Sequence, residues 1–355
     1  MYLIVNENGS DNIGDHAINE GLQSTFSVLN KSYRSVPFAS FGPNAKVSQS
    51  PSNKSLSKAR FSGRLKKLLI SNSFLLSVYW FLKNIRRVSG CVSDIRVKGV
   101  LVGGGQLILS GATFPIAMAT WVILARFYKK PIWLVGVGCG EKFSRFESFL
   151  LRLALKRTNN ILVREAESID KLKTIFDVDA SYCPDLAFGL SPLPSIEKKD
   201  RIVVGVTDFN VYLRYRKEVG APEHNCKEQY LFEWRDRLLS LVSDPNIEIV
   251  FASTTLKDLS INNEFYNLIK DSGVPNMLTN INELLTLTQY RYVLANSKMV
   301  FSGRMHSLIL GKIEGCVVQP WLISKKLVHF VQNYKNADTN NLKKDVTKKI
   351  SELLI

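Results

Sequence analysis

Residues 98–140 contain the stretch that decides the fold: "KGVLVGGG" (98–105), "FPIAMATWVILARFY" (114–128) and "PIWLVGVGCG" (131–140). The first and third segments are nearly continuous apolar runs that end in glycines, and the middle segment is long enough for a helix. Continuous apolar strands are typical of a parallel sheet with both faces covered by helices. The stretch therefore predicts a strand–helix–strand unit with glycine turns where its strands end.

The same alternation runs along most of the chain of 355 residues, which is too long for one ordinary core. Between two series of strands and helices, "SPLPSIEKKDR" (191–201) is the best linker candidate, because prolines, serines and charges cluster in it. We therefore predict two doubly wound α/β domains, at 1–190 and 200–335, and a terminal helix at 336–355. In the second series we also predict a helix at "INELLTL" (281–287). Ligands of such sheets bind outside the carboxyl ends of the strands, so we expect the chemistry in a cleft there.

The net charge of +16 at pH 7 is unevenly distributed. The block from Gly21 to Ser93 has no Asp or Glu but twelve Lys and Arg. Within it, basic clusters flank an apolar run in segment 58–87, whose apolar part of roughly 22 Å is shorter than a membrane core of ~30 Å. We interpret this segment as facing an anionic membrane surface; a core helix of the first domain is the alternative. No nucleic-acid partner is expected, because no reading motif accompanies the charge.

The cysteines and the N-terminus indicate a cytoplasmic protein. The five cysteines are scattered without a C-x-x-C pair, so neither a disulfide framework nor a structural zinc site is expected. The first residues, "MYLIVN" (1–6), resemble a strand rather than a signal peptide.

Four stretches that follow predicted strands carry possible chemistry. In "NIGDHAINEG" (12–21), Gly14 permits a tight turn and Asp15 begins a helix, either as its N-cap or as an acid or base. In "VFSGRMHSLILG" (300–311), Arg304 and His306 begin a helix, whose N-terminus attracts anions. A helix cap with a surface charge is the alternative interpretation there.

The two other stretches lie in the first domain. Arg164 ends a strand and Ser168 lies on the next helix, so Arg164 could clamp an anion or pair with Glu165, Glu167 or Asp185. Glycine-rich strand ends let a backbone approach a ligand closely, or simply make tight turns. The glycines concerned are Gly103, Gly104, Gly105 and Gly138.

The order of these motifs resembles the polysaccharide pyruvyl transferase family. The resemblance rests on "NIGDHAI", "VGGGQL", "GVGCG", "VREAES", "CPDLAF", "SGRMHSLILG" and Lys326 in "SKKLVHF". The sequence departs from the family at Glu141, where many members have proline, and Lys325 competes with Lys326 for the lysine position. The resemblance implies two Rossmann-like domains in a GT-B-like arrangement with an inter-domain cleft.

The resemblance also implies transfer of pyruvate from phosphoenolpyruvate to a sugar as a ketal. It implies a donor site built from Arg164, Arg304, His306 and Lys326, with Ser168 beside Arg164. We hypothesise that His306 is the general acid and Asp15 the base on the acceptor hydroxyl, with the reverse assignment open. Arg304 would also steady the departing phosphate. No metal or other cofactor is expected.

The expected acceptor is a cell-surface polysaccharide precursor, a lipid-linked oligosaccharide, which would hold the enzyme at the inner face of the cell membrane. One alternative is a GT-B glycosyltransferase that uses a nucleotide sugar, for which Glu314 is the nearest candidate ribose ligand. The other is a non-catalytic basic membrane-binding protein.

Overall fold

The computed structural model describes residues 1–7, 9–39, 73–111, 113–194, 197–220, 224 and 226–354. They form two compact units. The first unit contains residues 1–9, 25–186 and 345–355, and the second contains residues 10–24 and 187–344. Helices α1 (Ile13–Val28) and α13 (Thr339–Leu353) therefore each contribute residues to both units.

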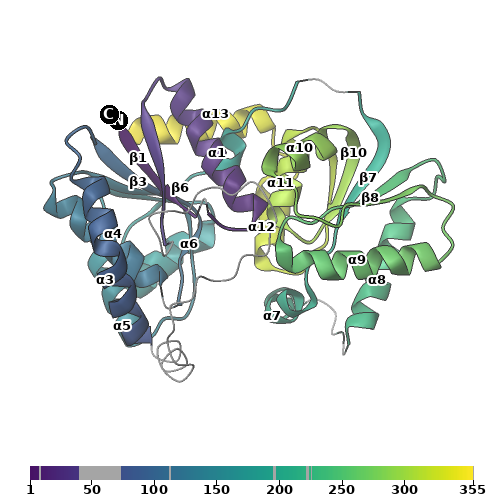
Figure 1. The fold of residues 1–355 in the computed structure, drawn as a ribbon, viewed down its shortest axis with the longest axis horizontal. Helices are drawn as coiled ribbons and strands as arrows, with labels where there is room; N and C mark the ends of the chain where they lie inside the picture. Colours follow the sequence, from purple (N-terminus) through teal and green to yellow (C-terminus); the bar gives the residue numbers. More distant parts are fainter. Residues whose placement is uncertain are drawn as a thin grey trace. The chain divides into compact units, whose positions relative to one another are not determined.

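The first unit is a parallel sheet with strand order β2-β1-β3-β4-β5-β6. Helices α3, α4 and α5 lie together on one face of this sheet (Figure 1). The elements are β1 (Tyr2–Asn6), β2 (Tyr33–Pro37), α3 (Ser73–Val92), β3 (Gly99–Ile108), α4 (Phe114–Phe127), β4 (Ile132–Cys139), α5 (Arg145–Leu155), β5 (Asn160–Val163), α6 (Ala166–Lys171), the π-helical η1 (Leu172–Phe176) and β6 (Ser181–Tyr182). A 3₁₀ helix, η2 (Leu186–Gly189), lies where the chain enters the second unit.

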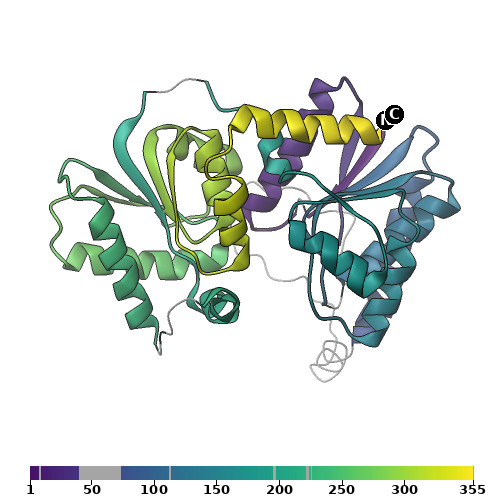
Figure 2. The ribbon, with the colours of Figure 1, turned by 180° about the vertical axis from the view of Figure 1, so that it is seen from behind.

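The second unit is a parallel sheet with strand order β11-β10-β7-β8-β9. Helices α8 and α9 lie on one face of it and α10 and α11 on the other, as the front and back views show (Figure 1, Figure 2). The elements are β7 (Lys199–Gly205), α7 (Phe209–Val219), α8 (Lys227–Leu241), β8 (Glu248–Phe251), α9 (Leu256–Asp271), β9 (Leu278–Asn280), α10 (Leu287–Ala295), β10 (Ser297–Ser302), α11 (Met305–Ile313), β11 (Val317–Pro320) and α12 (Lys325–Asn333).

The predicted strand–helix–strand unit at 98–140 is present as β3, α4 and β4. All eight residues of β4 are buried, and in β3 nine of ten are. Helix α4 covers these strands with Trp121, Val122 and Ala125, all fully buried. The continuous apolar runs thus form central strands covered on both faces, as their composition indicated.

The predicted helix at 281–287 is wrong, because α10 begins only at Leu287. Thr286 is its N-cap and forms a capping box, in which its side chain accepts the N–H of Gln289 and the Gln289 side chain accepts the N–H of Thr286. The capping box fixes the first turn after Thr286 and leaves the preceding residues outside the helix.

Only part of the basic segment 58–87 lies within the described residues, because residues 58–72 fall outside them. The remainder belongs to α3, whose inner face packs on the sheet: Trp80 is fully buried and donates its indole N–H to the carbonyl oxygen of Ala39 (3.1 Å). Arg87 is held by the carbonyl oxygens of Pro37 (2.7 Å) and Phe38 (3.4 Å). The inner side of α3 therefore packs in the core of the first unit, while its outer side is exposed.

No described helix is long and apolar enough to cross a membrane. The described cysteines Cys91, Cys139, Cys183, Cys226 and Cys316 are all free thiols. Burial raises the pKa of both Cys139 and Cys183 to about 12, so these two thiols stay protonated near neutral pH and are poor nucleophiles.

The Glu147 carboxylate ties α5 to the loop after β3. It accepts hydrogen bonds from the N–H of Ser144 (2.8 Å), the N–H of Gly111 (2.9 Å) and the hydroxyl of Ser110 (3.0 Å). Burial raises the pKa of Glu147, but the hydrogen bonds from Ser144 and Gly111 outweigh this effect. The net result is a pKa below the usual value of 4.5.

We expect Glu147→Gln to lower the free energy of unfolding by about 1–2 kcal/mol at pH 7, because an amide cannot accept all three hydrogen bonds. Since the folded-state pKa is depressed, the contribution of the carboxylate is present above pH 4.5 and is lost as the pH falls through the lower folded-state value. Denaturant unfolding at several pH values measures the difference from wild type. The exposed Glu141→Gln is the control, and a difference that stays constant well below pH 4.5 would contradict this assignment.

Candidate active site

Three loops of the second unit meet where adjacent strands end. β10, β7 and β8 are neighbours in the sheet, and each leads within a few residues into a helix: α11, α7 and α9. The hydroxyl of Ser302 donates to the carbonyl oxygen of Gly205 (3.0 Å), and the Ala252 N–H donates to the carbonyl oxygen of Val204 (3.0 Å). The N-termini of these helices therefore lie at the same edge of the sheet, formed by the carboxyl ends of the strands. Ligands of parallel sheets bind at this edge.

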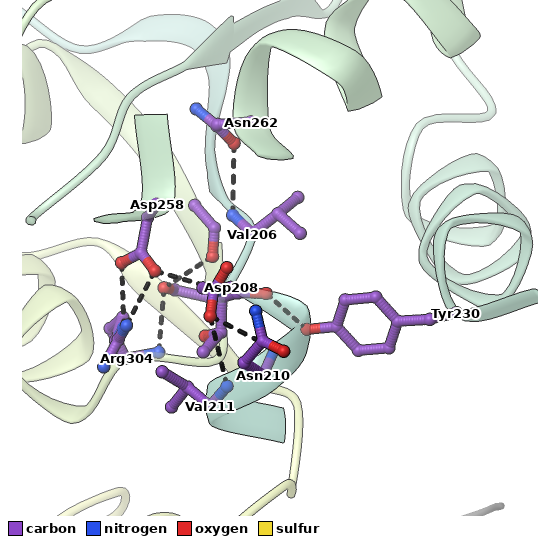
Figure 3. A network of polar contacts seen from close by, with 11 residues as sticks. Val206, Asp208, Asn210, Val211, Tyr230, Asp258, Asn262 and Arg304 are labelled. Carbon is purple, nitrogen blue, oxygen red and sulfur yellow. Dashed lines mark hydrogen bonds and ion pairs between the residues drawn. The ribbon is translucent and has the colours of Figure 1, made fainter. Parts of the chain in front are cut away.

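Arg304 is fixed at this edge by the carboxylate of Asp258 (Figure 3). Its Nε lies 2.8 Å from Oδ2 and its Nη2 lies 2.6 Å from Oδ1, so the pair is bidentate. Asp258 is in the first turn of α9 and is 1% exposed, whereas Arg304 is 25% exposed. A two-point pair of this kind fixes the plane of the guanidinium as well as its position.

Asp258 also orients the loop after β7. Its Oδ1 accepts the N–H of Asp208 (2.9 Å), and Asp208 in turn caps α7 by accepting the N–H groups of Asn210 (3.1 Å) and Val211 (3.2 Å) (Figure 3). One buried carboxylate therefore holds residues from β10–α11 and from β7–α7 in a fixed relation.

The pairing leaves one edge of the Arg304 guanidinium available. Nη1 has no hydrogen bond to any described residue, whereas Nε and Nη2 are both engaged. Arg304 is also the N-cap residue of α11, and its side chain makes no capping bond. The strand end that carries the first N–H groups of α11 therefore also carries a fixed guanidinium, and both kinds of group favour an oxyanion.

Two buried hydroxyl groups at the same strand ends have no hydrogen-bond partner among the described residues. They are Oγ1 of Thr207, a residue 1% exposed, and Oγ of Ser253, a residue 2% exposed. A Cβ at Gly303 would overlap the Thr207 hydroxyl, so only glycine lets the loop before Arg304 pass this close. Buried groups of this kind commonly bind water or a ligand.

His306 packs directly against the N-terminus of α1. A Cβ added to Gly14 would overlap Nδ1 and Cγ of the His306 ring, so Gly14 is required for this approach. The start of α1 is held in the second unit by the Ile13 N–H, which donates to the carbonyl oxygen of Thr254 (2.9 Å), and by a bridge between Asn12 and Thr255. The sequence predicted both glycine and histidine as site residues, and the structure brings them together.

Asp15 lies next to Gly14 but is not the N-cap of α1. Asn12 has that role, because its Oδ1 accepts the N–H of Gly14 (3.0 Å). The Asp15 carboxylate is half-buried and accepts the hydroxyl of Ser10 (2.6 Å). Asp15 is thus one residue from the contact with His306, and its proposed acid or base role stays a prediction.

Lys326 also belongs to the second unit. It is the second residue of α12, which follows β11 and has Ser324 at its N-cap position. Lys326 is half-buried, whereas Lys325 is exposed. Like Arg304 and His306, Lys326 lies at the N-terminal end of a helix that follows a strand.

Arg164 and Ser168 belong to the first unit. Arg164 is 3% exposed and pairs with Asp185 through Nη1 (2.8 Å) and with Glu165 through Nε (3.3 Å). The Ser168 hydroxyl donates to Glu165 (3.3 Å) and accepts the N–H of Cys139 (3.0 Å). These ion pairs match the alternative that the sequence left open, and binding of the donor by Arg164 stays a prediction.

The predicted glycine loops lie in or beside the first sheet. Gly104 and Gly105 have φ of 77° and 80°, which a side chain would strain. Gly103 has no room for a Cβ because Val135 fills the space, and a Cβ at Gly138 would press on Glu165. These glycines therefore serve backbone geometry and packing, and their contact with a ligand remains a prediction.

Neither a metal site nor the shallow cavity of the first unit points to another location among the described residues. Among the described residues, no group of three His, Cys, Asp or Glu side chains is placed to hold a metal ion. A shallow cavity of about 300 Å³ includes Asn160 and Asp177 in its lining, but it lies at the amino end of β5. Ligands of parallel sheets bind at the opposite ends of the strands.

Sequence reasoning missed Asp258 as the partner of Arg304. The stretch "TLKD" (255–258) has the spacing of a capping box, in which the fourth residue bonds back to the first. The Thr255 side chain makes no capping bond, and Asp258 instead reaches Arg304 and Asp208. The spacing could have identified the acid, but not its partner.

The family model for polysaccharide pyruvyl transferase matches residues 12–316. No curated protein sequence matches the chain significantly. Among solved structures, a putative UDP-N-acetylglucosamine 2-epimerase from Listeria monocytogenes has a TM-score of 0.55 at 12% identity and covers 99% of this chain and 87% of its own. The UDP-GlcNAc 2-epimerase from Methanocaldococcus jannaschii has a TM-score of 0.50 at 10% identity and covers 99% of both chains. These likenesses confirm the GT-B-like, two-domain α/β fold and nothing about the substrate.

We expect Gly14→Ala to lower turnover about 100-fold, because a methyl group there displaces the His306 ring from its place. The variant should remain folded, with a free energy of unfolding close to that of the wild type, although its turnover falls. Gly9→Ala is the matched control, since a Cβ at Gly9 meets nothing within 4 Å. Equal activity of the two variants would show that the contact between Gly14 and His306 has no role in the reaction.

We expect Asp258→Asn to raise the KM for the donor about tenfold or more, because the amide releases the Arg304 guanidinium from its fixed plane. Steady-state kinetics at several donor concentrations separates this effect on KM from one on kcat. Asp200→Asn, which removes the exposed partner of Lys298, should leave both constants unchanged. A purely structural role for Asp258 predicts a loss of folded protein with an unchanged KM in the remainder.

Proposed function

Because the chain belongs to the polysaccharide pyruvyl transferase family, we propose that it transfers pyruvate from phosphoenolpyruvate to two hydroxyl groups of a sugar, forming a ketal and releasing phosphate. The observation that carries the donor assignment is Arg304, which Asp258 fixes at the N-terminus of α11 with Nη1 left available. A donor with a phosphate and a carboxylate needs such a fixed cation beside helix N–H groups.

The reaction balances without a cofactor. One proton is added to the methylene carbon of phosphoenolpyruvate, which becomes the methyl group, and positive charge develops at the neighbouring carbon. Two sugar oxygens bond to that carbon as the bond to the phosphate oxygen breaks. Of the two hydroxyl protons, one replaces the proton delivered to carbon and the other leaves with phosphate.

We assign the proton transfers to His306 and Asp15. An imidazole ring can both donate and accept a proton, so we assign the protonation of the methylene carbon to His306. Asp15 would then accept a proton from the attacking hydroxyl, and the reverse assignment remains open. The His306 ring contacts Gly14, the residue directly before Asp15, and this proximity supports the pairing.

Arg304 would hold the donor and steady the departing phosphate, together with Lys326 at the start of α12. For Arg164, donor binding would require that the guanidinium exchange or share its bonds to Asp185 and Glu165. The buried hydroxyl groups of Thr207 and Ser253 would be further hydrogen-bond donors to phosphoenolpyruvate at the strand ends of the second unit.

The acceptor that we propose is a lipid-linked oligosaccharide precursor of a cell-surface polysaccharide, used at the cytoplasmic face of the cell membrane. The basic composition of the first unit supports this location.

A nucleotide-sugar glycosyltransferase is the weaker candidate. Its candidate ribose ligand, Glu314, is 6% exposed and already accepts hydrogen bonds from Arg291 Nε (2.7 Å) and the Leu193 N–H (2.9 Å). A buried carboxylate committed to an ion pair is poorly placed to bind a ribose hydroxyl.

We expect phosphoenolpyruvate to raise the melting temperature of the protein, while nucleotide sugars leave it unchanged, because bound ligand stabilises the folded state. With phosphoenolpyruvate and lipid-linked oligosaccharide, the protein should release phosphate and add the mass of pyruvate less water to the oligosaccharide. Arg304→Ala and His306→Ala should abolish this product, and the exposed Lys270→Ala should not. Stabilisation by nucleotide sugars alone, or full activity in both site variants, would overturn the proposal.

A further inference from the structure

The outer surfaces of α3, α4 and α5 expose large apolar side chains together with arginines. We propose that this surface, which we call the three-helix face, docks on an anionic membrane. Its apolar members are Val78 (40% exposed), Leu82 (68%), Ile123 (40%), Phe127 (74%) and Phe149 (63%). Its basic members are Arg86, Arg126 and Arg145.

These side chains come from helices that are packed side by side. The hydroxyl groups of Ser89 on α3 and Tyr128 at the end of α4 are hydrogen-bonded (2.8 Å). α4 packs in turn against α5, and all three helices lie on the same face of the sheet (Figure 1). Leu82 precedes Ser89 on α3, and Ile123 precedes Tyr128 on α4. Each lies about 7–11 Å along its helix axis from the hydrogen bond between Ser89 and Tyr128, so Leu82 and Ile123 lie at similar heights on the face.

The spacing places the apolar side chains on the outer side of each helix. Val78 and Leu82 are four residues apart on α3, and so are Ile123 and Phe127 on α4. The inner side of α3 is Trp80, Asn84 and Val88, and that of α4 is Trp121, Val122 and Ala125, all of them buried. Each helix is thus apolar on two sides, and only one side is needed for the core.

The exposed apolar surface is large for a monomer. The five apolar side chains together expose on the order of 500 Å², comparable with the largest apolar patch of a typical soluble monomer, and such patches often have a function. Such a surface indicates a partner that can accept apolar side chains.

The charge of the face identifies the partner. Helices α3 and α4 contain no Asp or Glu, and the one acid of α5, Glu147, is buried and hydrogen-bonded. Within the described part of the chain, Arg86, Arg126 and Arg145 form no ion pair, and all three are exposed. The second unit differs in the charge of its exposed helices. Helix α8 by itself contains three acidic residues: Glu228, Glu233 and Asp236.

Apolar side chains beside unpaired arginines fit a lipid interface. There, phenylalanine and leucine enter the region between headgroups and acyl chains while arginines meet lipid phosphates. Nucleic acid would use the charge but would leave the apolar surface unexplained. The helices can only lie on the membrane, because their inner sides are fixed to the sheet.

This inference rests on the proposed location at a membrane, and vesicle binding tests it separately from pyruvyl transfer. We expect the full-length protein to float with phosphatidylcholine vesicles that contain phosphatidylserine or phosphatidylglycerol, and far less with phosphatidylcholine alone. Arg86→Gln with Arg126→Gln should weaken binding about 25-fold, since each charge near an anionic surface contributes about fivefold, the equivalent of about 1 kcal/mol.

The double variant Leu82→Ser with Phe127→Ser should also release the protein from the vesicles. Its matched control is Met277→Ser with Phe232→Ser, two exposed apolar residues of the second unit (68% and 44%). Lys217→Gln with Lys270→Gln is the control for charge. Arg87 is left unchanged in every variant because it is bonded to Pro37 and Phe38.

Two results would overturn the proposal: absence of flotation with anionic vesicles, or flotation that the face variants and the controls reduce equally. If sedimentation velocity shows a dimer that Leu82→Ser with Phe127→Ser dissociates, the face binds a second copy of the chain instead. Pyruvyl transfer to a soluble sugar acceptor is measured in parallel. Flotation without pyruvyl transfer would support the docking face and contradict the proposed reaction. Pyruvyl transfer without flotation would support the reaction and contradict the docking face.

Discussion

The ion pair between Arg304 and Asp258 is the contact on which the geometry of the second unit's strand ends depends. Asp258 is buried and holds two loops at once, through the guanidinium of Arg304 and through the N–H of Asp208. Removing a buried charge from its partner costs several kcal/mol, so neither loop can move independently. The same bond decides which part of the guanidinium remains available, and this in turn decides where an anion can be bound.

A second constraint comes from the chain path. Residues 10–24 belong to the second unit although β1 and β2, on either side of them in sequence, belong to the first. The start of α1 is held at the end of β8 by Thr254 and Thr255, and there Gly14 admits the ring of His306. The second unit therefore carries Asp15 together with His306, Arg304 and Lys326, and all four lie at the N-terminal ends of helices.

The sequence was sufficient for the parallel α/β architecture because buried parallel strands have an unmistakable composition. The continuous apolar runs at 98–105 and 131–140 became β3 and β4. It was insufficient where tertiary contacts decide: the apolar spacing at 281–287 suggested a helix, but the capping box at Thr286 starts α10 later. The Arg304–Asp258 pair joins residues 46 positions apart, and no local pattern encodes such a separation.

The most direct test of the central claim is a crystal structure of the protein with bound phosphoenolpyruvate. The account predicts a phosphate or carboxylate oxygen of the donor within hydrogen-bond distance of Arg304 Nη1 and of the first N–H groups of α11, with the Arg304–Asp258 pair intact. It would be contradicted by a donor bound elsewhere on the protein while Arg304 Nη1 contacts only solvent.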